Sequence, residues 1–410
     1  MAANGSPALM RAINASRVIQ ELRAGGVQSR ADLVRATGLS KPTITNVVAH
    51  LEALEYIART EETAKTTDGR GAQAPRYEYR ASRGQVLGID IGADKTLLVL
   101  ADLAGTTLGS ARFTTPSTQG VKRILGQISR TADRLLADAG GTSNTLLAVV
   151  AGTPGVVSRD GVVTMAPQLD GWEGLDLAGA LREIFSCPVA VESEVTLSLQ
   201  AERWLGVTQG IDDALFVHLG VGVGAGLLVD GLSHRGADGA AGEIGLMPYP
   251  VAQPDGGTVF QPLESLASGG ALQRRGAALA ATPEGALLKS LAGGDADAVD
   301  AALVFTAMRQ SDPAATALVD DAIAILAWGI SCLVCALNPR RVVLGGGLSG
   351  SADMFLDTLR ERVATSVPFA PEWFVSELGD EAVAFGAVNQ ATVLVESGLF
   401  ESLNNKELVS

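Results

Sequence analysis

The sequence predicts an α/β protein with a small helical head at the N-terminus and a larger body of two related lobes. Near the N-terminus, apolar residues recur with a helical period, whereas from Gln85 onward short β-branched runs alternate with helical stretches. A similar order of elements begins again near Ala214. Residues 1–83 carry a net charge of +4 and residues 84–410 carry −18. A basic head on an acidic body indicates that only the head meets a polyanion.

The head, residues 1–83, reads as three short helices interrupted by glycine. The interruptions lie at Gly25-Gly26 and at Gly38, where a helix ends readily. Ser29 and Ser40 stand where N-caps of the second and third helices belong. Pro42 falls in the first turn of the third helix, where its missing N–H removes no hydrogen bond. The spacing therefore predicts a compact three-helix unit.

The third helix of the head separates into an apolar and a polar face. The apolar stripe comprises Ile44, Val47, Val48, Leu51 and Leu54. The opposite face presents short polar groups that can enter a DNA major groove and reach base edges or phosphates. The candidate DNA contacts on this helix and at its start are Ser40, Lys41, Thr43, Thr45, Asn46 and His50. An ordinary solvated face, as in a protein-binding module, is the alternative interpretation.

A hairpin is predicted directly after the third helix. The segments Tyr56 to Thr60 and Arg76 to Arg80 have β-tolerant residues, and the loop between them is rich in Gly, Thr and Lys. Such a hairpin is typical of a wing. Lys65, Arg70 and Arg76 are placed to reach the DNA backbone or minor groove. The head is thus predicted to be a winged helix-turn-helix, with Arg70 as a further DNA contact.

The body repeats one order of strands and helices. Its first copy consists of strands at Gln85–Ile91, Thr96–Ala101 and Thr106–Phe113, a helix at Val121–Ala139 and a strand at Thr145–Ala151. Its second copy contains strands at Ala214–Leu219, Gly224–Val229 and Arg341–Leu344, with a long helix before the last. Residues 84–206 and 207–410 are therefore expected to form two related lobes. The second lobe is expected to serve dimerisation and effector binding.

Three glycine-rich turns follow predicted strands. They are Asp90–Lys95, Gly220–Gly226 and Gly345–Gly347. A glycine turn lets the backbone approach a phosphate, although glycine at a strand end is more often plain turn chemistry. Three such turns in this order are better evidence for a phosphate-binding backbone than any one alone.

The motifs of the body resemble the ROK family (repressors, open reading frames and kinases). The resemblance rests on GIDIGADKT, AGTPGVV, APQLDGW, VESEV, HLGVGVGAG, RGADGAAGEIGLM, PLES, NPRRVVLGGG and EAVAFGA, in that order. The head segment GLSKPTITNVVAHLEALEYI is similar to the DNA-binding domain of the repressor branch. The resemblance implies a sugar-kinase-like fold of the actin-like ATPase type, with a sugar cleft between two lobes.

The same resemblance implies a set of sugar-contacting positions. They are Gly155, Gln168, Ser193, Glu194, Glu243 and Glu264. Glu243 and Glu264 match the family, whereas Gln168 replaces an Asn and the pair Ser193-Glu194 replaces an Asn-Asp pair whose Asp is the catalytic base. The alternative is that the two matching glutamates are structural residues of a vestigial cleft.

The positions that serve phosphoryl transfer in the family are altered. Glu194 reaches one methylene further than the family's Asp, and a misplacement of about 1 Å can cost on the order of a hundredfold in rate. Asp94 puts a negative charge where a phosphate would sit, and Val221 replaces a Thr that donates to phosphate. Leu246 replaces a zinc-binding His, and residues 248–264 contain no Cys. We therefore assign no catalytic residue, no metal and no cofactor.

The N-terminus lacks a basic segment and an apolar segment of the secretory kind, so a cytoplasmic protein is expected. The longest apolar run, Ala322–Leu337, has 16 residues and is shorter than the roughly 20 residues of a membrane span. We interpret it as a core helix with no membrane role. Cys332 and Cys335 within it are expected to be packing residues, with a redox pair as the minor alternative.

The sequence as a whole predicts a transcriptional regulator of carbohydrate-related genes, in the manner of a repressor. The head would bind double-stranded operator DNA as a symmetric homodimer or tetramer, and the body would sense a sugar or sugar derivative. One alternative is an active ATP-dependent sugar kinase that also binds DNA. Another is a DNA-binding regulator controlled by a protein partner.

Overall fold

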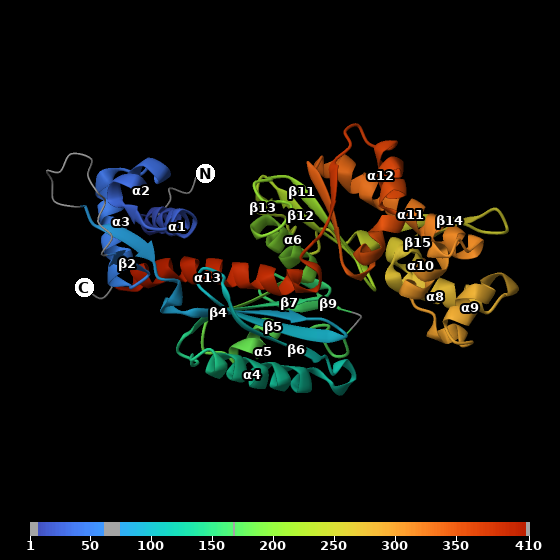
Figure 1. Cartoon of the computed structure of the whole chain (residues 1–410), viewed down its shortest axis with the longest axis horizontal. Coiled ribbons are helices and arrows are strands. Elements are labelled where there is room, and N and C mark those ends of the chain that lie inside the picture. The colour runs from blue at the N-terminus through green and yellow to red at the C-terminus, as the bar shows by residue number, and fades with distance from the viewer. Residues whose placement is uncertain (1–6, 61–73, 167–168, 407–410) are drawn as a thin grey trace. The chain divides into compact units, whose positions relative to one another are not determined.

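The computed structural model describes residues 7–60, 74–166 and 169–406 (Figure 1). By packing, the chain forms two compact units. The first comprises Met1–Ala151, Leu177–Ala190 and Ala387–Ser410, and the second comprises Gly152–Asp176 and Val191–Gly386. The head and first lobe thus share a unit, to which the end of the chain returns. This division is not the linear one with boundaries after residues 83 and 206.

The head has the predicted helices and hairpin. Its elements are α1 (Pro7–Gly25), β1 (Gln28–Ser29), α2 (Arg30–Thr37), α3 (Lys41–Ala53), β2 (Ile57–Thr60) and β3 (Arg76–Tyr79). The three strands form an antiparallel sheet in the order β1-β3-β2. A winged helix-turn-helix is therefore confirmed.

Local sequence signals fix the ends of the head helices. The side chain of Ser29 accepts a hydrogen bond from the Asp32 amide, and the Asp32 carboxylate accepts one from the Ser29 amide, which is a capping box. Because the carboxylate accepts hydrogen bonds from Ser29, the pKa of Asp32 is lowered. Gly38 ends α2 with a φ of 70°, and Ser40 caps α3. Both predicted N-caps are confirmed.

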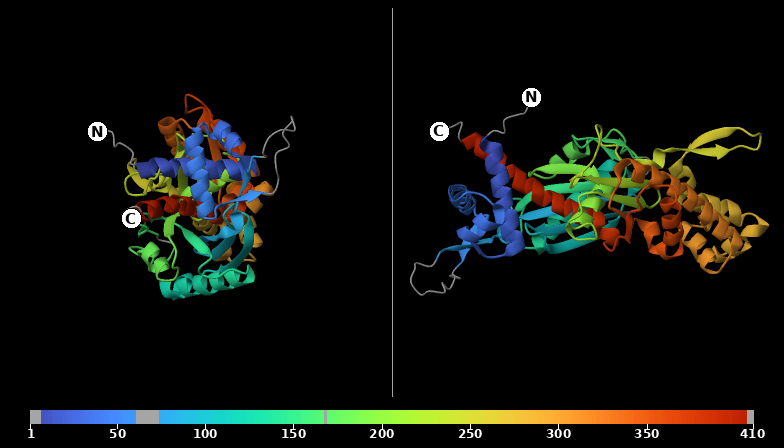
Figure 2. Two further views of the ribbon diagram at one scale, coloured as in Figure 1. Left: turned by 90° about the vertical axis from the view of Figure 1, so that its left-hand side faces the viewer. Right: turned by 90° about the horizontal axis from the view of Figure 1, so that it is seen from above.

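The first lobe is a five-stranded sheet with the order β10-β7-β4-β5-β6. Its strands are β4 (Gln85–Ile91), β5 (Lys95–Asp102), β6 (Thr107–Thr114), β7 (Leu146–Thr153) and β10 (Val189–Ser193). Helix α4 (Val121–Asp138) covers one face, and the C-terminal helix α13 (Ala382–Lys406) lies on the other, as Figures 1 and 2 show. A short helix, α5 (Leu177–Arg182), completes this lobe.

The second unit contains another five-stranded sheet, in the order β13-β12-β11-β16-β17. Its strands are β11 (Ala214–Leu219), β12 (Val223–Val229), β13 (Leu232–Ser233), β16 (Arg341–Gly345) and β17 (Glu372–Val375). Two hairpins, β8 (Val156–Val157) with β9 (Val163–Met165) and β14 (Pro248–Ala252) with β15 (Thr258–Pro262), accompany it. Its helices are α6 (Glu194–Trp204), α7 (Leu263–Ala267), α8 (Gly269–Ala280), α9 (Ala286–Leu291), α10 (Ala301–Arg309), α11 (Pro313–Leu337) and α12 (Leu356–Ala364).

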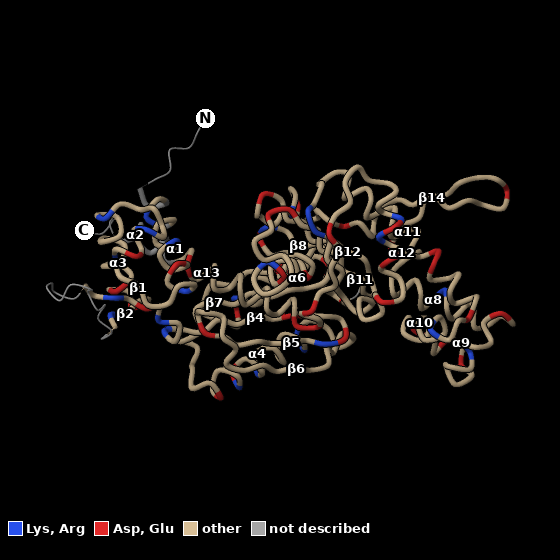
Figure 3. Tube along the Cα trace, turned by 45° about the horizontal axis from the view of Figure 1, so that its top comes forward, with Lys and Arg blue, Asp and Glu red and all other residues tan. Residues whose placement is uncertain are grey.

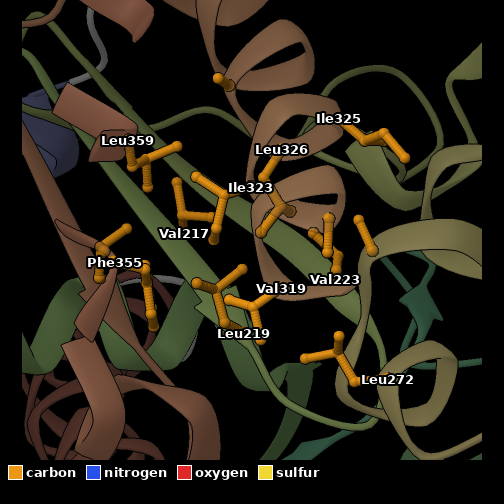
Figure 4. Packing of buried hydrophobic residues seen from close by; sticks show 14 of the residues in the cluster. Val217, Leu219, Val223, Leu272, Val319, Ile323, Ile325, Leu326, Phe355 and Leu359 are labelled. Carbon is orange, nitrogen blue, oxygen red and sulfur yellow. The ribbon is translucent and has the colours of Figure 1, made fainter. Parts of the chain in front are cut away.

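Helix α11 is at the centre of the second unit's core. Val319, Ile323 and Leu326 pack with Val217 and Leu219 of β11 in one apolar cluster (Figure 4). By length and composition α11 is able to cross a membrane, but more than half of its apolar window is buried inside the protein. This burial agrees with a core helix.

The predicted packing role of Cys335 is wrong. Cys335 is exposed and Cys332 is half-buried. In a run that is apolar on every side, the sequence does not show which face of the helix turns outward.

Helix α13 begins in the second unit and continues into the first. At Gly386, still in the second unit, a Cβ atom would lie 1.9 Å from the carbonyl oxygen of Leu197 on α6, so only glycine permits this approach. Further along, in the first unit, the buried carboxylate of Glu396 lies 3.0 Å from a guanidinium nitrogen of Arg23 on α1. Arg23 also donates to the carbonyl of Ala104 in the first lobe. The head is therefore anchored to both α13 and the lobe.

Candidate functional site

Helix α3 presents the polar face that the sequence predicts. Ile44, Val47, Val48 and Leu51 are buried against the rest of the head. The candidate DNA contacts Ser40, Lys41, Thr45 and Asn46 are exposed, and Thr43 and His50 are half-buried. Since the N-cap hydroxyl of Ser40 lies 2.8 Å from the hydroxyl of Thr43, the start of α3 forms a hydrogen-bonded polar cluster. This face suits docking to a nucleic acid.

The wing differs in one respect from the prediction. The strands β2 and β3 pair in the expected register, from Ile57 opposite Tyr79 to Thr60 opposite Arg76. Arg76, however, donates from its guanidinium to the carbonyl of Val27 at 2.7 Å, so it helps to hold the head together. Lys65 and Arg70, the other two predicted wing contacts, lie outside the described residues, and their roles stay predictions.

A cavity with both apolar and ionisable side chains in its walls lies in the second unit. Its volume is about 100 Å³, and its walls come from β8–β9, α6, the β11–β12 turn, the 3₁₀ segment Ile244–Leu246 and α7. The lining residues are Pro154, Gly155, Met165, Glu194, Val195, His218, Gly222, Val223, Gly224, Glu243, Gly245, Leu246 and Glu264. All of them belong to the second unit, although the resemblance implies a cleft between two lobes.

Three carboxylates and one imidazole face this cavity. Glu264, at the start of α7, accepts a hydrogen bond from the buried amide of Val223 at 2.9 Å. Glu243 accepts none from the described chain and is available to a ligand. Burial, followed by the charges of Glu264 and Glu194, raises the pKa of Glu243. The two matching glutamates thus differ, because one is held by the backbone and the other is open.

Glu194 begins α6 and lies beside His218 of β11. The distance from Oε1 of Glu194 to Nε2 of His218 is 3.9 Å, and each side chain is about one-fifth exposed. A carboxylate and an imidazole at this distance can accept from and donate to hydroxyl groups of one bound molecule.

Two of the other predicted sugar contacts, Gly155 and Ser193, have structural roles. A Cβ atom on Gly155 would lie 1.8 Å from the carbonyl oxygen of Met165, so this position needs glycine to close the turn beside the cavity. Ser193 is buried and caps α6 by accepting from the amide of Thr196, and it is not among the lining residues. Its contact with a sugar stays a prediction. Gln168 lies outside the described residues.

The glycine-rich turn between β11 and β12 is bonded to the start of α8. The amide of Gly269 donates to the carbonyl of Gly220, and the amide of Gly270 donates to the carbonyl of Val221. Two of the first amides of this helix are thereby occupied within the protein. The side chain of Val221 is 64% exposed and offers only methyl groups.

Sequence reasoning missed His218 and the apolar wall formed by Met165, Val195 and Leu246. A signal for His218 was present, because it is the one polar residue in an otherwise apolar strand and lies two positions before the glycine-rich turn. The apolar residues carry no such signal, since their positions depend on how distant segments pack.

Comparison with known proteins follows the division into head and body. A model of the ROK family matches residues 86–392, and a model of the MarR family matches residues 13–70. A xylose repressor of Caldicellulosiruptor bescii is 24% identical over 392 residues, which cover 94% of this chain and 96% of the relative.

Two solved structures are similar in fold. A ROK family transcriptional regulator, described as a homologue of the E. coli MLC protein, superimposes with a TM-score of 0.78 at 20% identity and covers 96% of this chain and 98% of its own. A ROK family glucokinase from Streptomyces griseus, in complex with glucose and AMPPNP, gives a TM-score of 0.63 at 28% identity, over 75% of this chain and 99% of its own. The regulator likeness extends over the head as well as the body.

Proposed function

The chain belongs to the ROK family, and on that premise we propose that it is a sugar-responsive transcriptional repressor that binds operator DNA. The observation that carries this proposal is the presence in one chain of an exposed polar recognition face and a carboxylate-lined cavity. We place it in the cytoplasm as a symmetric homodimer or tetramer, since a two-fold assembly matches a palindromic operator.

The cavity favours a neutral sugar over a phosphorylated one. Carboxylates accept hydrogen bonds from hydroxyl groups and repel phosphate, and Glu194, Glu243 and Glu264 all line this small space. At about 15 Å³ for each water position, a cavity of about 100 Å³ has room for a monosaccharide-sized group of hydroxyls but not for a large ligand. Xylose and glucose are the first sugars to test, because relatives include xylose repressors and glucokinases.

Catalysis of phosphoryl transfer is not part of the proposal. The amides at the start of α8 are occupied by Gly220 and Val221, and Val221 offers no hydroxyl. Asp94 adds a negative charge to the first glycine-rich turn. Each of these features weakens the binding of a transferred phosphate, and phosphoryl transfer depends on that binding.

The residues at the family's zinc positions do not fit the metal. Leu246 has no ligand atom, and its side chain is 53% exposed at the cavity. The stretch that would supply cysteines instead forms the hairpin of β14 and β15, which is ordered by its own backbone pairing from Pro248 opposite Pro262 to Ala252 opposite Thr258. A hairpin of this kind needs no metal to fold.

Helix α13 offers a route by which sugar binding reaches the head. Glu194 lines the cavity and begins α6, the same helix whose Leu197 lies against Gly386. From Gly386, α13 runs to Glu396, which pairs with Arg23 of the head. A ligand that favours one arrangement of α6 would thereby favour one arrangement of the head.

An electrophoretic mobility assay tests the proposal. The full chain is titrated against DNA from upstream of its own gene, with and without xylose or glucose. We expect the chain to retain the DNA. A sugar should raise the apparent dissociation constant for that DNA at least tenfold. If the chain retains no fragment of that region, the DNA-binding part is wrong, and if DNA is retained but no sugar from a broad monosaccharide panel alters it, the sensor part is wrong.

An active kinase remains the competing function, because Glu194 is chemically able to act as a base. A coupled assay of ATP consumption with the same sugars separates the two. Turnover that depends on sugar and disappears in Glu194→Gln would overturn the assignment of a silent kinase body.

A further inference from the structure

A second hollow lies in the first unit, on the side of the sheet that α4 covers. Its volume is about 510 Å³, and it is open to solvent between the edge strand β6 and α4. The residues that line this groove, which we name the arginine groove, are Arg112, Phe113, Arg123, Gln127, Arg130, Thr131 and Arg134. No carboxylate is among them, in a chain whose net charge is −14.

The spacing along α4 brings the basic groups together. Arg123, Gln127, Arg130 and Arg134 recur at i, i+4, i+7 and i+11, which places them in one row of the helix. With a rise of about 1.5 Å per residue, Arg123 and Arg130 start about 10 Å apart. A Cβ atom on Gly126 would lie 3.5 Å from Nη1 of Arg130, so this guanidinium extends back along α4 toward Arg123. Figure 3 marks the basic positions on α4.

The helix does not balance these charges internally. Arg123, Arg130 and Arg134 form no salt bridge with any described carboxylate, and all three are exposed. Arg130 and Arg134 are like charges at i, i+4, which disfavour the helix. Asp133 and Asp138 lie on the same helix but do not line the groove. A solvated surface helix has no need of such a row.

We propose that the arginine groove binds a small molecule with two phosphate groups, as a second effector site. A guanidinium group pairs with phosphate oxygens through two parallel hydrogen bonds. Arg123 and Arg130 leave the helix backbone about 10 Å apart, so that their side chains can both reach one diphosphate. Gln127 and Thr131 supply further hydrogen-bond donors between the arginines, and Phe113 forms an apolar wall. The hollow has the size of known small-ligand sites, roughly 300–1,000 Å³.

The groove is separate from the cavity in chemistry as well as position. One is lined by arginines in the first unit, and the other is lined by glutamates in the second. Of these two hollows, the arginine groove suits a phosphorylated ligand and the cavity suits a neutral sugar.

Isothermal titration calorimetry with inorganic pyrophosphate on the full chain tests the proposal. We expect saturable binding of one pyrophosphate per chain, and at least tenfold weaker binding of inorganic phosphate, which engages fewer arginines. The double variant R123Q/R130Q should weaken pyrophosphate binding at least tenfold. R123K/R130K keeps the charge but loses the two-pronged guanidinium geometry. Its affinity for pyrophosphate should lie between those of R123Q/R130Q and the parent chain.

The matched control is K122Q/R159Q, which removes the same charge from exposed positions outside the groove. It should bind pyrophosphate as the parent chain does. No saturable heat with the parent chain, or equal losses in R123Q/R130Q and the control, would overturn the proposal. The dependence of DNA affinity on salt concentration gives a further test. If it becomes weaker in R123Q/R130Q but not in the control, the groove contacts the DNA backbone and the proposal is overturned. Thermal unfolding and circular dichroism confirm that each variant is folded.

Discussion

The two units of the chain use charge in opposite ways. The first holds the exposed polar face of α3 and the arginine groove, both suited to anions. The second gathers Glu194, Glu243 and Glu264 around one cavity, which suits hydroxyl groups and repels phosphate. In a fold similar to that of a ROK family glucokinase, the surfaces suited to anions therefore lie in the unit that carries the head.

A sugar kinase binds its sugar and its phosphate donor at one site, and these two kinds of binding are separated in this chain. A kinase holds sugar and phosphate together, whereas here the carboxylate cavity and the basic surfaces lie in different units. Variants in one unit should therefore change one kind of binding and leave the other intact.

The largest effect is expected in the first unit, at the recognition face. Replacing Thr45 and Asn46 with alanine removes two exposed groups that can reach base edges, each worth about 1–3 kcal/mol. Operator affinity should fall about a hundredfold to a thousandfold, while sugar binding measured by calorimetry stays unchanged. Replacing the exposed Thr107 and Ser110 of β6 with alanine is the control and should leave both unchanged. Equal losses in the two variants would show that α3 does not read DNA.

The next effect concerns the anchor of the head. Glu396→Ala leaves Arg23 without its buried partner, which should lower the free energy of unfolding of this unit by about 3 kcal/mol. Urea unfolding followed by fluorescence and circular dichroism measures the loss. Glu52→Ala is the matched control, because its pair with Arg59 is much more exposed and should contribute less than about 1 kcal/mol. Similar losses would mean that α13 does not hold the head.

A smaller effect is expected in the second unit. Glu243→Gln replaces the open carboxylate of the cavity, and a hydrogen bond to a charged group is worth about 1.5–3 kcal/mol. Sugar affinity should fall at least tenfold, whereas operator affinity without sugar should not change. Glu361→Gln, an exposed position on α12, controls for the loss of one charge. Unchanged sugar binding in Glu243→Gln would remove this glutamate from the site.

The smallest effect is a dependence of stability on pH. The pKa of Glu243 is raised in the folded chain, so the folded state binds more protons than the unfolded state. The contribution of Glu243 to stability is therefore full below its ordinary pKa of 4.5 and declines as pH rises through the raised value. Urea unfolding between about pH 4 and 7 should show a shallower decline in Glu243→Gln than in the parent chain. If the free energy of unfolding changes with pH equally in Glu243→Gln and the parent chain, the raised pKa of Glu243 is contradicted.

Local signals allowed much of the fold to be predicted. The bounds of β4 and β11 match the predicted strands, and the N-caps Ser29 and Ser40 stand where predicted, because periodicity and capping are properties of neighbouring residues. The glutamates of the cavity were found through resemblance. Neither route reveals the pair of Arg23 and Glu396, which are 373 residues apart. Contacts of that separation depend on the packing of whole elements.

Gly386 gives α13 a fixed angular phase as well as a fixed position. With about 100° of rotation per residue, the ten residues from Gly386 to Glu396 set the angle around the α13 axis between the face that touches Leu197 and the face that carries Glu396. One residue inserted between these two positions would turn Glu396 by about 100° and separate it from Arg23, while the cavity and the head each kept their own fold. On the proposed route through α13, the regulator would then still bind sugar and bind DNA, but the two events would be independent.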